Sequence, residues 1–416
     1  MKSKRVSIAY PAVFFMIISS ISCELKTAPP EPVGPSIAAD TPETPPTDQG
    51  EFSWLTIDGK PKNIEDLRSF LENRMKDEGI SGLSVIIKQT KSTGTASYRL
   101  NLGAENPGSK KPIDDLTVFR ADRFGQLVMA YIVLQFATYG QFDIDKPLRD
   151  YLTDMPLEGS PFRALQNDSR GRRLTARMIL SQQSGLSDSR ASSSPEKIEF
   201  IDRPGKGFLY SETAFALLRF VLEKRFKLEI NEIARRLVFE PFHMKRTSFV
   251  REPRFEGHIA ANKENSKSSS LRENGKALAF YTNVDDALEF VWLVTWGNPF
   301  LSRRFLEPLT YAPSVSIRSI SITDPRLKAE RGTLPRKLSW CLGWGSYFVR
   351  WIDLIGANFL GQKSPNLESY LFTNYSRDIT AFIAFIVTDN PKSFMPVVVE
   401  ETLGKIPTPL AWLGFN

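Results

Sequence analysis

The sequence contains one serine and lysine whose spacing matches that of a nucleophile and its base. Ser194 and Lys197 are three residues apart, and on a helix this spacing sets a hydroxyl beside an amine that could take its proton. Their segment, Ser194-Pro195-Glu196-Lys197, belongs to a serine-rich stretch with proline in second place, and it does not head an apolar helix. Proline and serine here favour a loop. We interpret the pair as a chance match, not as a nucleophile with its base.

Metal and redox chemistry are not expected from the residues that could support them. The chain has two cysteines, Cys23 and Cys341, and two histidines, His243 and His258, all far apart in sequence. A structural zinc site needs four closely placed ligands, and a disulfide framework needs several cysteines. We therefore expect no metal, no cofactor and no intramolecular disulfide, and we interpret His243 as a turn or surface residue.

The composition is that of a folded globular protein with a mildly basic surface. Of the 416 residues 41% are hydrophobic and 24% charged, and the formal net charge is +7. No dense stripe of lysine and arginine occurs, so we predict no binding to nucleic acid. A modest positive charge would favour anionic components of a cell envelope.

The first 22 residues have the pattern of an export signal. A basic start (Lys2, Lys4, Arg5) precedes an apolar run over 6–21, which is too short and too broken by Pro11 for a comfortable membrane span. The run ends in Ser20-Ile21-Ser22-Cys23, and two interpretations stay open. Cys23 is the lipidated first residue of a membrane-anchored lipoprotein facing the periplasm or cell surface, or ordinary cleavage after Ser22 releases a soluble periplasmic or secreted protein.

Residues 23–51 are predicted to be a tether and 52–416 a folded domain. The tether is rich in Pro, Thr, Glu and Asp, a composition that buries too little apolar surface to fold. As an extended polyproline-type spacer, residues 27–50 could reach roughly 70 Å at about 3.1 Å per residue. A tether directly after Cys23 suits a domain held away from a membrane, although a tail without a role is the simpler alternative.

Hydrophobic patterning in the remaining chain predicts strands at both ends and helices between them. We expect helices over 63–76, 127–137, 174–180 (with Thr175 as cap), 214–223 and 233–239, a loop over 262–274, and strands over 82–87, 342–349, 369–373 and 379–387. This order suggests a sheet built from both ends of the chain with an inserted helical lobe, an α+β fold in two lobes.

Six segments, in chain order, resemble class C β-lactamases and DD-peptidases, the serine β-lactamase and penicillin-binding-protein family. They are Gly79-Ile80-Ser81-Gly82-Leu83-Ser84-Val85, Leu116-Thr117-Val118-Phe119-Arg120, Leu180-Ser181-Gln182-Gln183-Ser184-Gly185-Leu186, Pro204-Gly205-x-x-Phe208-x-Tyr210-Ser211 with Ala214-Phe215-Ala216-Leu217-Leu218, Phe239-Glu240-Pro241-Phe242-x-Met244-x-x-Thr247-Ser248-Phe249, and Leu342-Gly343-Trp344. The resemblance implies an antiparallel sheet flanked by helices, with a helical lobe and a cleft between the lobes.

The same resemblance implies acyl-transfer chemistry whose residues are missing from this chain. The family uses a Ser-x-x-Lys pair at the head of the central helix, a tyrosine on a loop of the helical lobe, and a Lys/His-x-Gly strand. Counted from Phe119-Arg120, the serine and lysine positions fall on Arg123 and Gln126, and the last motif aligns with Phe359-Leu360-Gly361. Tyr210 is kept, but Glu212 stands where the family has asparagine.

These replacements remove the steps of the family's mechanism. A guanidinium stays protonated and cannot attack a carbonyl, and an amide takes no proton at neutral pH. Positive charge at a helix N-terminus is also unfavourable without a carboxylate nearby. We therefore expect Arg123 and Glu212 to pair and fill the former active site, the alternative being that both point into solvent.

The sequence thus predicts an envelope pseudoenzyme whose cleft binds a peptide, a cell-wall fragment or an envelope protein. Two alternatives stay open. One is an active hydrolase of the esterase, DD-peptidase or β-lactamase type that uses other residues. The other is an adhesin-like surface lipoprotein, for which the tether is the one indication.

Overall fold

The computed structural model describes most of the chain beyond the predicted tether. The described residues are 52–91, 94–152, 168–187, 199–261, 279–296, 300–310, 314–316, 321–322, 338–350, 355–364, 366–374, 379–404 and 415. The predicted leader, Cys23 and tether, the Ser194–Lys197 segment and the predicted loop 262–274 lie outside these ranges. No helix within the described ranges is long and apolar enough to cross a membrane.

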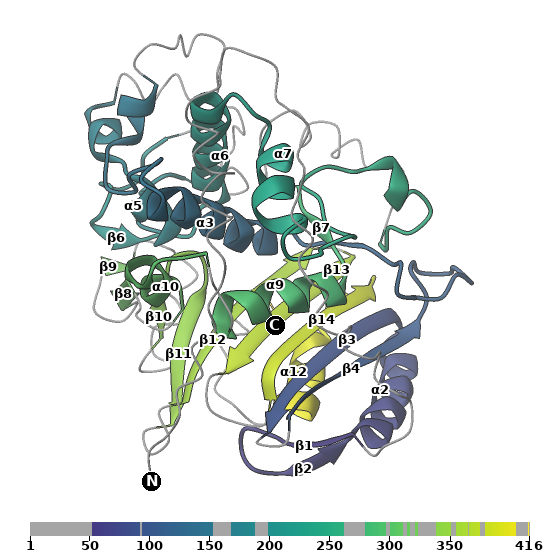
Figure 1. Ribbon diagram of the computed structural model, residues 1–416. Coiled ribbons are helices and arrows are strands. Elements are labelled where there is room, and N and C mark those ends of the chain that lie inside the picture. The colour runs from purple at the N-terminus through teal and green to yellow at the C-terminus, as the bar shows by residue number, and fades with distance from the viewer. Residues whose placement is uncertain are drawn as a thin grey trace.

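An antiparallel sheet of eight strands forms the lower lobe (Figure 1). In spatial order its strands are β4 (Gly94–Gly103), β3 (Ile80–Lys91), β14 (Ile379–Thr388), β13 (Leu367–Asn374), β12 (Ile355–Ser364), β11 (Gly345–Arg350), β10 (Ser339–Trp340) and β8 (Val315–Ser316). Strands from the two ends of the chain meet where β3 pairs with β14. Every residue of β14 is buried, which explains its continuous run of apolar and β-branched side chains.

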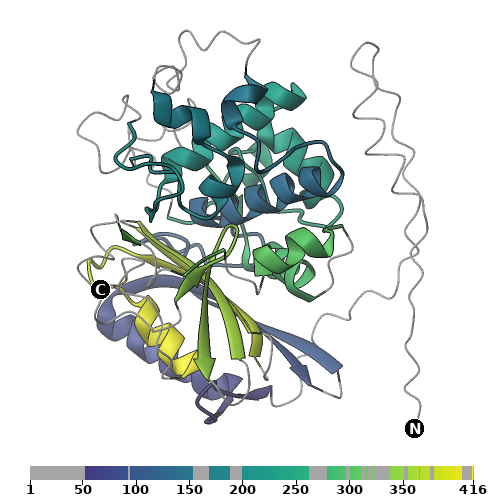
Figure 2. The same cartoon turned by 90° about the vertical axis from the view of Figure 1, so that its left-hand side faces the viewer.

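Helices cover both faces of this sheet (Figure 2). On one face α2 (Ile64–Glu78) and α12 (Met395–Leu403) contact each other and pack on β3 and β13. On the other face α9 (Val284–Trp296) packs on β3 and β14, and α3 (Asp122–Thr138) contacts β12. Buried side chains of the sheet and these helices belong to one hydrophobic core.

A helical lobe lies above the sheet and shares α3 with it (Figure 1). Its main helices are α5 (Ala176–Leu180), α6 (Glu212–Phe226) and α7 (Ile230–Ala234), with α10 (Arg303–Thr310) packed against α3 and α9. Shorter elements are β1 (Ser53–Leu55), β2 (Pro61–Asn63), β5 (Phe119–Arg120), β6 (Gly207–Phe208), β7 (Tyr281–Thr282), β9 (Ser321–Ile322), the 3-10 turns η2 (Leu148–Tyr151), η3 (Ser169–Arg173) and η5 (Pro253–Phe255), and the π-turn η4 (Arg235–Phe239). The α+β, two-lobed fold that the sequence predicts is confirmed.

Several predicted elements have different bounds in the structure. The predicted strand 342–349 is wrong in its first half, because residues 341–344 form the turn between β10 and β11. Gly343 makes this turn possible with φ +119°, and a Cβ there would lie 2.8 Å from the Cβ of Ala130 on α3. The predicted helix 233–239 is α7, from Ile230, followed by a π-turn.

Helix starts follow caps that the apolar pattern alone does not reveal. The oxygen of Asn63 accepts from the Asp66 amide and starts α2, and Thr175 caps α5 as expected. Ser211 caps α6, so Glu212 is the first residue of this helix and does not lie in the preceding loop. The central helix α3 begins at Asp122, five residues before the start at Leu127 that the apolar pattern predicts, and in agreement with the family resemblance, which places Arg123 at the head of this helix.

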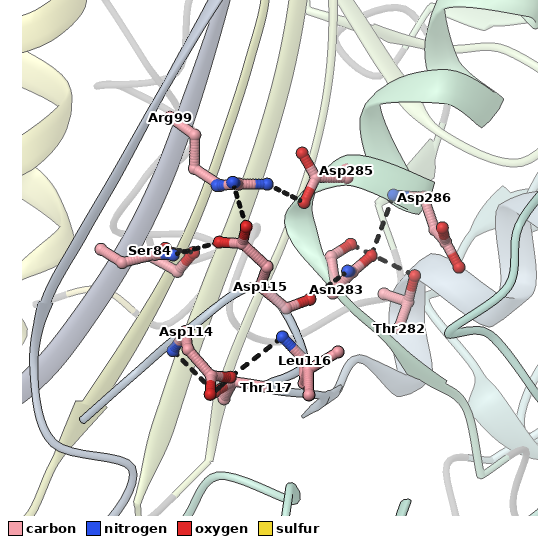
Figure 3. Close-up of polar contacts among 11 residues, drawn as sticks. Ser84, Arg99, Asp114, Asp115, Leu116, Thr117, Thr282, Asn283, Asp285 and Asp286 are labelled. Carbon is pink, nitrogen blue, oxygen red and sulfur yellow. Dashed lines mark hydrogen bonds and ion pairs between the residues drawn. The ribbon is translucent and has the colours of Figure 1, made fainter. Parts of the chain in front are cut away.

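A polar cluster ties the loop before α3 to α9 and to the edge of the sheet (Figure 3). The guanidinium of Arg99 on β4 lies 2.6 Å from Asp115 and 2.6 Å from Asp285 at the start of α9. The side-chain amide of Asn283 donates to the Asp115 carbonyl at 3.1 Å. These contacts fix the chain shortly before it enters β5 and α3.

Asp286, in the first turn of α9, is a buried acid beside this cluster. Its Oδ2 accepts from the backbone N–H of Arg246 at 2.6 Å and from the Thr247 hydroxyl at 2.8 Å. Burial raises the pKa of Asp286 to about 6, against the opposing effect of these two hydrogen bonds.

We predict that Asp286 stabilises the fold more strongly in mild acid than at neutral pH. The folded protein takes up a proton near pH 6 that the unfolded chain binds only near pH 4, so protonation favours the folded state in this window. Between pH 7 and pH 4, the free energy of unfolding of the wild type should rise by about 2–3 kcal/mol relative to Asp286→Asn. Urea denaturation of both proteins across this range measures the difference, and a constant difference would contradict the assignment.

Candidate functional site

The head of α3 is held in place by Arg120, just before the helix, and by Phe280. Ala121 at the N-cap offers no side-chain cap, but the Asp122 carboxylate accepts from Arg120 Nε at 2.9 Å and from the Phe280 amide at 3.2 Å. Gly125 lets the helix approach Phe280, since a Cβ there would lie 2.7 Å from the Cβ of Phe280. The side chain of Arg123 is thereby placed between the sheet and the helical lobe.

Arg123 is buried, with 7% of its surface exposed, and its guanidinium contacts both lobes. Nη1 donates to the Gly361 carbonyl of β12 at 2.6 Å. On the other side, Nε lies 3.6 Å from Glu212 Oε1, and the guanidinium carbon lies 4.6 Å from the centre of the Tyr210 ring. The expected Arg123–Glu212 ion pair is therefore formed, and the alternative of two solvent-directed side chains is wrong.

Helix dipoles explain why this pair can be buried. Arg123 stands at the N-terminus of α3, where positive charge is unfavourable, whereas Glu212 stands at the N-terminus of α6, where negative charge is favourable. Glu212 lies beside the guanidinium. Its negative charge therefore compensates both the charge of Arg123 and the positive end of the α3 dipole. The contact with the Tyr210 ring adds a cation–π interaction.

Tyr210 and Gln126 form the second polar contact of the site. The Tyr210 hydroxyl donates to Gln126 Oε1 at 3.1 Å, and both side chains are almost fully buried. A tyrosine beside an amide has a neutral hydrogen-bond acceptor but no base to take its proton. The positions where the family resemblance places the lysine and the tyrosine are thus in contact, without the acid–base chemistry of that pair.

Gln182 positions the Tyr210 loop, a role that sequence reasoning missed. Its carbonyl accepts from the Leu209 amide at 2.8 Å and its side-chain Oε1 accepts from the Ser211 amide at 3.0 Å, so it brackets Tyr210. To do this, fully buried Gln182 adopts φ +57°, a left-handed conformation that is uncommon outside glycine. Nothing in the sequence Leu180–Leu186 marks this residue except its place in a tight turn.

The strand β12 contributes Gly361 and Gln362 to the site but not the side chain of Phe359. Gln362 Oε1 accepts from the backbone N–H of Arg123 at 3.0 Å, so the side chain of Gln362 faces α3. Alternation along a strand then places Phe359 on the opposite face, where its buried ring lies over Gly345. The structure brings together Arg123, Gln126, Tyr210, Glu212 and Gly361 and leaves Phe359 apart.

The contacts of Arg123 leave little space beneath it. The cavity between the start of α3 and the sheet measures about 10 Å³, which is room for roughly one water molecule. Arg123, Gly361 and Leu371 are among the residues that line it. Through Arg123 this arrangement connects α3 to β12 and to the start of α6.

One group in the described residues could supply three metal ligands. Glu105, Asp114 and His258 each offer one ligand atom, and these atoms lie within 4.8 Å of one another. The ammonium of Lys111 already lies among them, 3.2 Å from Glu105 Oε1 and 3.4 Å from His258 Nδ1, and donates to the Gly257 carbonyl. The chain therefore neutralises this cluster with a cation of its own.

We predict that removing both charges of the Arg123–Glu212 pair destabilises the fold less than removing the Arg123 charge alone. Arg123→Met leaves the Glu212 carboxylate buried without its cation and should lower the free energy of unfolding by about 3 kcal/mol. The double variant Arg123→Met/Glu212→Gln should recover at least half of this loss, because neither charge remains.

Urea denaturation measures both variants against a matched surface pair. Arg303 is paired with Glu307 but its side chain is 87% exposed, so Arg303→Met should change stability by less than about 1 kcal/mol. A loss in Arg123→Met no larger than that in Arg303→Met would show that the buried pair does not stabilise the site.

Solved structures similar to this fold include β-lactamases and penicillin-binding proteins. A β-lactamase/D-alanine carboxypeptidase from Yersinia pestis superposes with a TM-score of 0.59 at 12% identity, over 78% of this chain and 93% of its own. A class C β-lactamase gives 0.60 at 12% identity, over 82% and 95%. An octameric penicillin-binding protein homologue from Pyrococcus abyssi gives 0.57 at 16%, over 84% and 76%.

Comparison of the sequence with protein-family models identifies the family, which structural similarity at 12–16% identity does not. Among curated proteins no sequence matches the chain. The family model described as Beta-lactamase, however, matches residues 67–379, a range that includes Arg123, Gln126, Tyr210, Glu212 and Gly361. The chain therefore belongs to the β-lactamase family.

Proposed function

We propose that this chain is a non-catalytic member of the β-lactamase family that acts as a binding protein outside the cytoplasm. The observation that carries the proposal is the buried Arg123 guanidinium at the head of α3, held by Gly361 and paired with Glu212. A permanently charged side chain stands where the family resemblance places the attacking hydroxyl. The neighbouring acid–base position is an amide, Gln126, which is engaged by Tyr210.

A nucleophile borrowed from nearby is not favoured by the contacts of the candidates. Ser211 follows Tyr210, but its hydroxyl caps α6 by accepting from the Ala214 amide and donates to the Ser187 carbonyl. Burial raises the pKa of the Cys341 thiol to about 12, so the thiolate that would attack is scarce at neutral pH. Ser194 and Lys197 lie outside the described residues, and an active hydrolase built on them remains the alternative.

The proposed ligand is a peptide, a cell-wall fragment or an envelope protein. Two features support this: the family's fold with its two lobes, and the export-type leader followed by a Pro-rich tether in the sequence. Because the centre of the site is filled by Arg123, such a ligand would contact the rim of the cleft and not the head of α3. The proposal places the protein on the envelope, anchored by lipidation of Cys23.

We predict that the purified protein neither turns over nor becomes acylated. Incubation with a chromogenic cephalosporin, p-nitrophenyl acetate and a fluorescent penicillin should give rates equal to buffer and no fluorescent band. The reason is the absence of an activated hydroxyl at the head of α3. Labelling or turnover above buffer would contradict the proposal, and Ser194→Ala and Tyr210→Phe variants would then show whether these residues carry the activity.

We also predict that membrane attachment depends on Cys23. In cells making the full chain, the protein should sediment with membranes and be released from them by detergent, since a diacylated terminus binds the bilayer stably. Cys23→Ser should move the exported protein to the soluble fraction, while Cys341→Ser, which changes the other cysteine, should not. A membrane-bound Cys23→Ser protein would contradict lipid anchoring.

A further inference from the structure

Gln362 supplies a cap that α3 lacks in its own sequence. The first N–H groups of a helix have no acceptor within the helix. Ala121 at the N-cap of α3 has no side-chain oxygen that could accept a hydrogen bond from them. Gln362 reaches across from β12, and its Oε1 accepts from the backbone N–H of Arg123 at 3.0 Å. Gln362 as a whole is 7% exposed, so this hydrogen bond is largely shielded from water.

Two consecutive residues of β12 thus bind residue 123 in two different ways. Gly361 accepts from the Arg123 side chain through its carbonyl, and Gln362 accepts from the Arg123 backbone through its side chain. The first contact depends on arginine at this position. The second does not, because the backbone N–H would be present with any residue other than proline.

This backbone N–H has a chemical use that the cap takes away. In acyl transfer the carbonyl oxygen of the substrate becomes negative, and backbone N–H groups at a helix N-terminus can stabilise it. For this the N–H must have no other acceptor. The Arg123 N–H instead donates to the side-chain Oε1 of Gln362, at a normal hydrogen-bond distance.

We propose that Gln362 is a second block to acyl transfer, independent of the loss of the nucleophile. This inference rests on the proposed non-catalytic function and extends it, because it states that restoring a serine and a lysine would not restore the reaction. Gln362 is here a positioning residue that acts through the backbone of residue 123. Only when its amide is removed does the head of α3 become able to hold an anionic oxygen.

The test restores the missing groups and varies Gln362 alone. The starting variant carries Arg123→Ser, Gln126→Lys and Glu212→Asn, which removes both charges of the buried pair and introduces the hydroxyl and the amine. With a fluorescent penicillin, the introduced hydroxyl oxygen would bond to the β-lactam carbonyl carbon, and the ring C–N bond would break. The hydroxyl proton would pass through the introduced amine to the ring nitrogen.

Adding Gln362→Ala to this variant should increase the rate of covalent labelling about 100-fold, the usual effect of one oxyanion donor. Gln89→Ala is the matched control, since Gln89 is a buried glutamine of the same sheet that donates to the Ser53 carbonyl. Equal labelling with and without Gln362→Ala, including no labelling in either, overturns the inference. Labelling of the wild-type chain would instead overturn the proposed function.

A second measurement does not require the restored variant to fold. In the otherwise unchanged chain, Gln362→Ala should raise the hydrogen-exchange rate of the Arg123 amide roughly tenfold, the effect of losing about one hydrogen bond's net stabilisation. The Gln89→Ala protein should keep the wild-type rate at this amide. An unchanged Arg123 exchange rate in Gln362→Ala would show that Gln362 does not hold the N–H and would overturn the inference.

Discussion

A guanidinium cannot discharge itself by losing a proton, so burying Arg123 between the lobes requires acceptors and a counter-charge around it. The sheet provides the carbonyl of Gly361, and the helical lobe provides the Glu212 carboxylate and the face of the Tyr210 ring. Through these contacts Arg123 connects α3 to both α6 and β12.

The other replacements in the site follow the same requirement for internal pairing. Gln126 accepts from the Tyr210 hydroxyl, and Gln362 accepts from the Arg123 amide in the first turn of α3. Gln182 adopts a left-handed backbone conformation and accepts hydrogen bonds from the amides of Leu209 and Ser211, which flank Tyr210. Active sites commonly keep polar groups poised for a substrate and lose stability for it. Here Gln126, Gln182 and Gln362 each accept a hydrogen bond from another residue of the site, while Arg123 Nε and Gln182 Nε2 are buried without a hydrogen-bond acceptor among the described residues.

Some of this site could be predicted from the sequence, because the motifs that flank it are local. The order of six short segments predicts the family and the two-lobed α+β fold, and counting from Phe119-Arg120 places Arg123 and Gln126 at the head of the central helix. Charge and the family resemblance together predict the partner of Arg123, since a buried cation needs an acid and the resemblance places the motif with Glu212 opposite the head of the central helix. Phe359 was placed by the same alignment, but strand alternation turns its side chain away.

The sequence by itself determined which side chains stand at the aligned positions: the hydroxyl, the amine and the Lys/His side chain of the family pattern are absent there whatever the geometry. Only the tertiary structure decided which contacts the residues in their place make. Gln362 and Gln182 contact residues 239 and 29 positions away along the chain, and a glutamine carries no pattern that reveals such a partner. Hydrogen bonds between distant segments depend on the register of β12 and on a single left-handed turn, and both are fixed only when the lobes pack against each other.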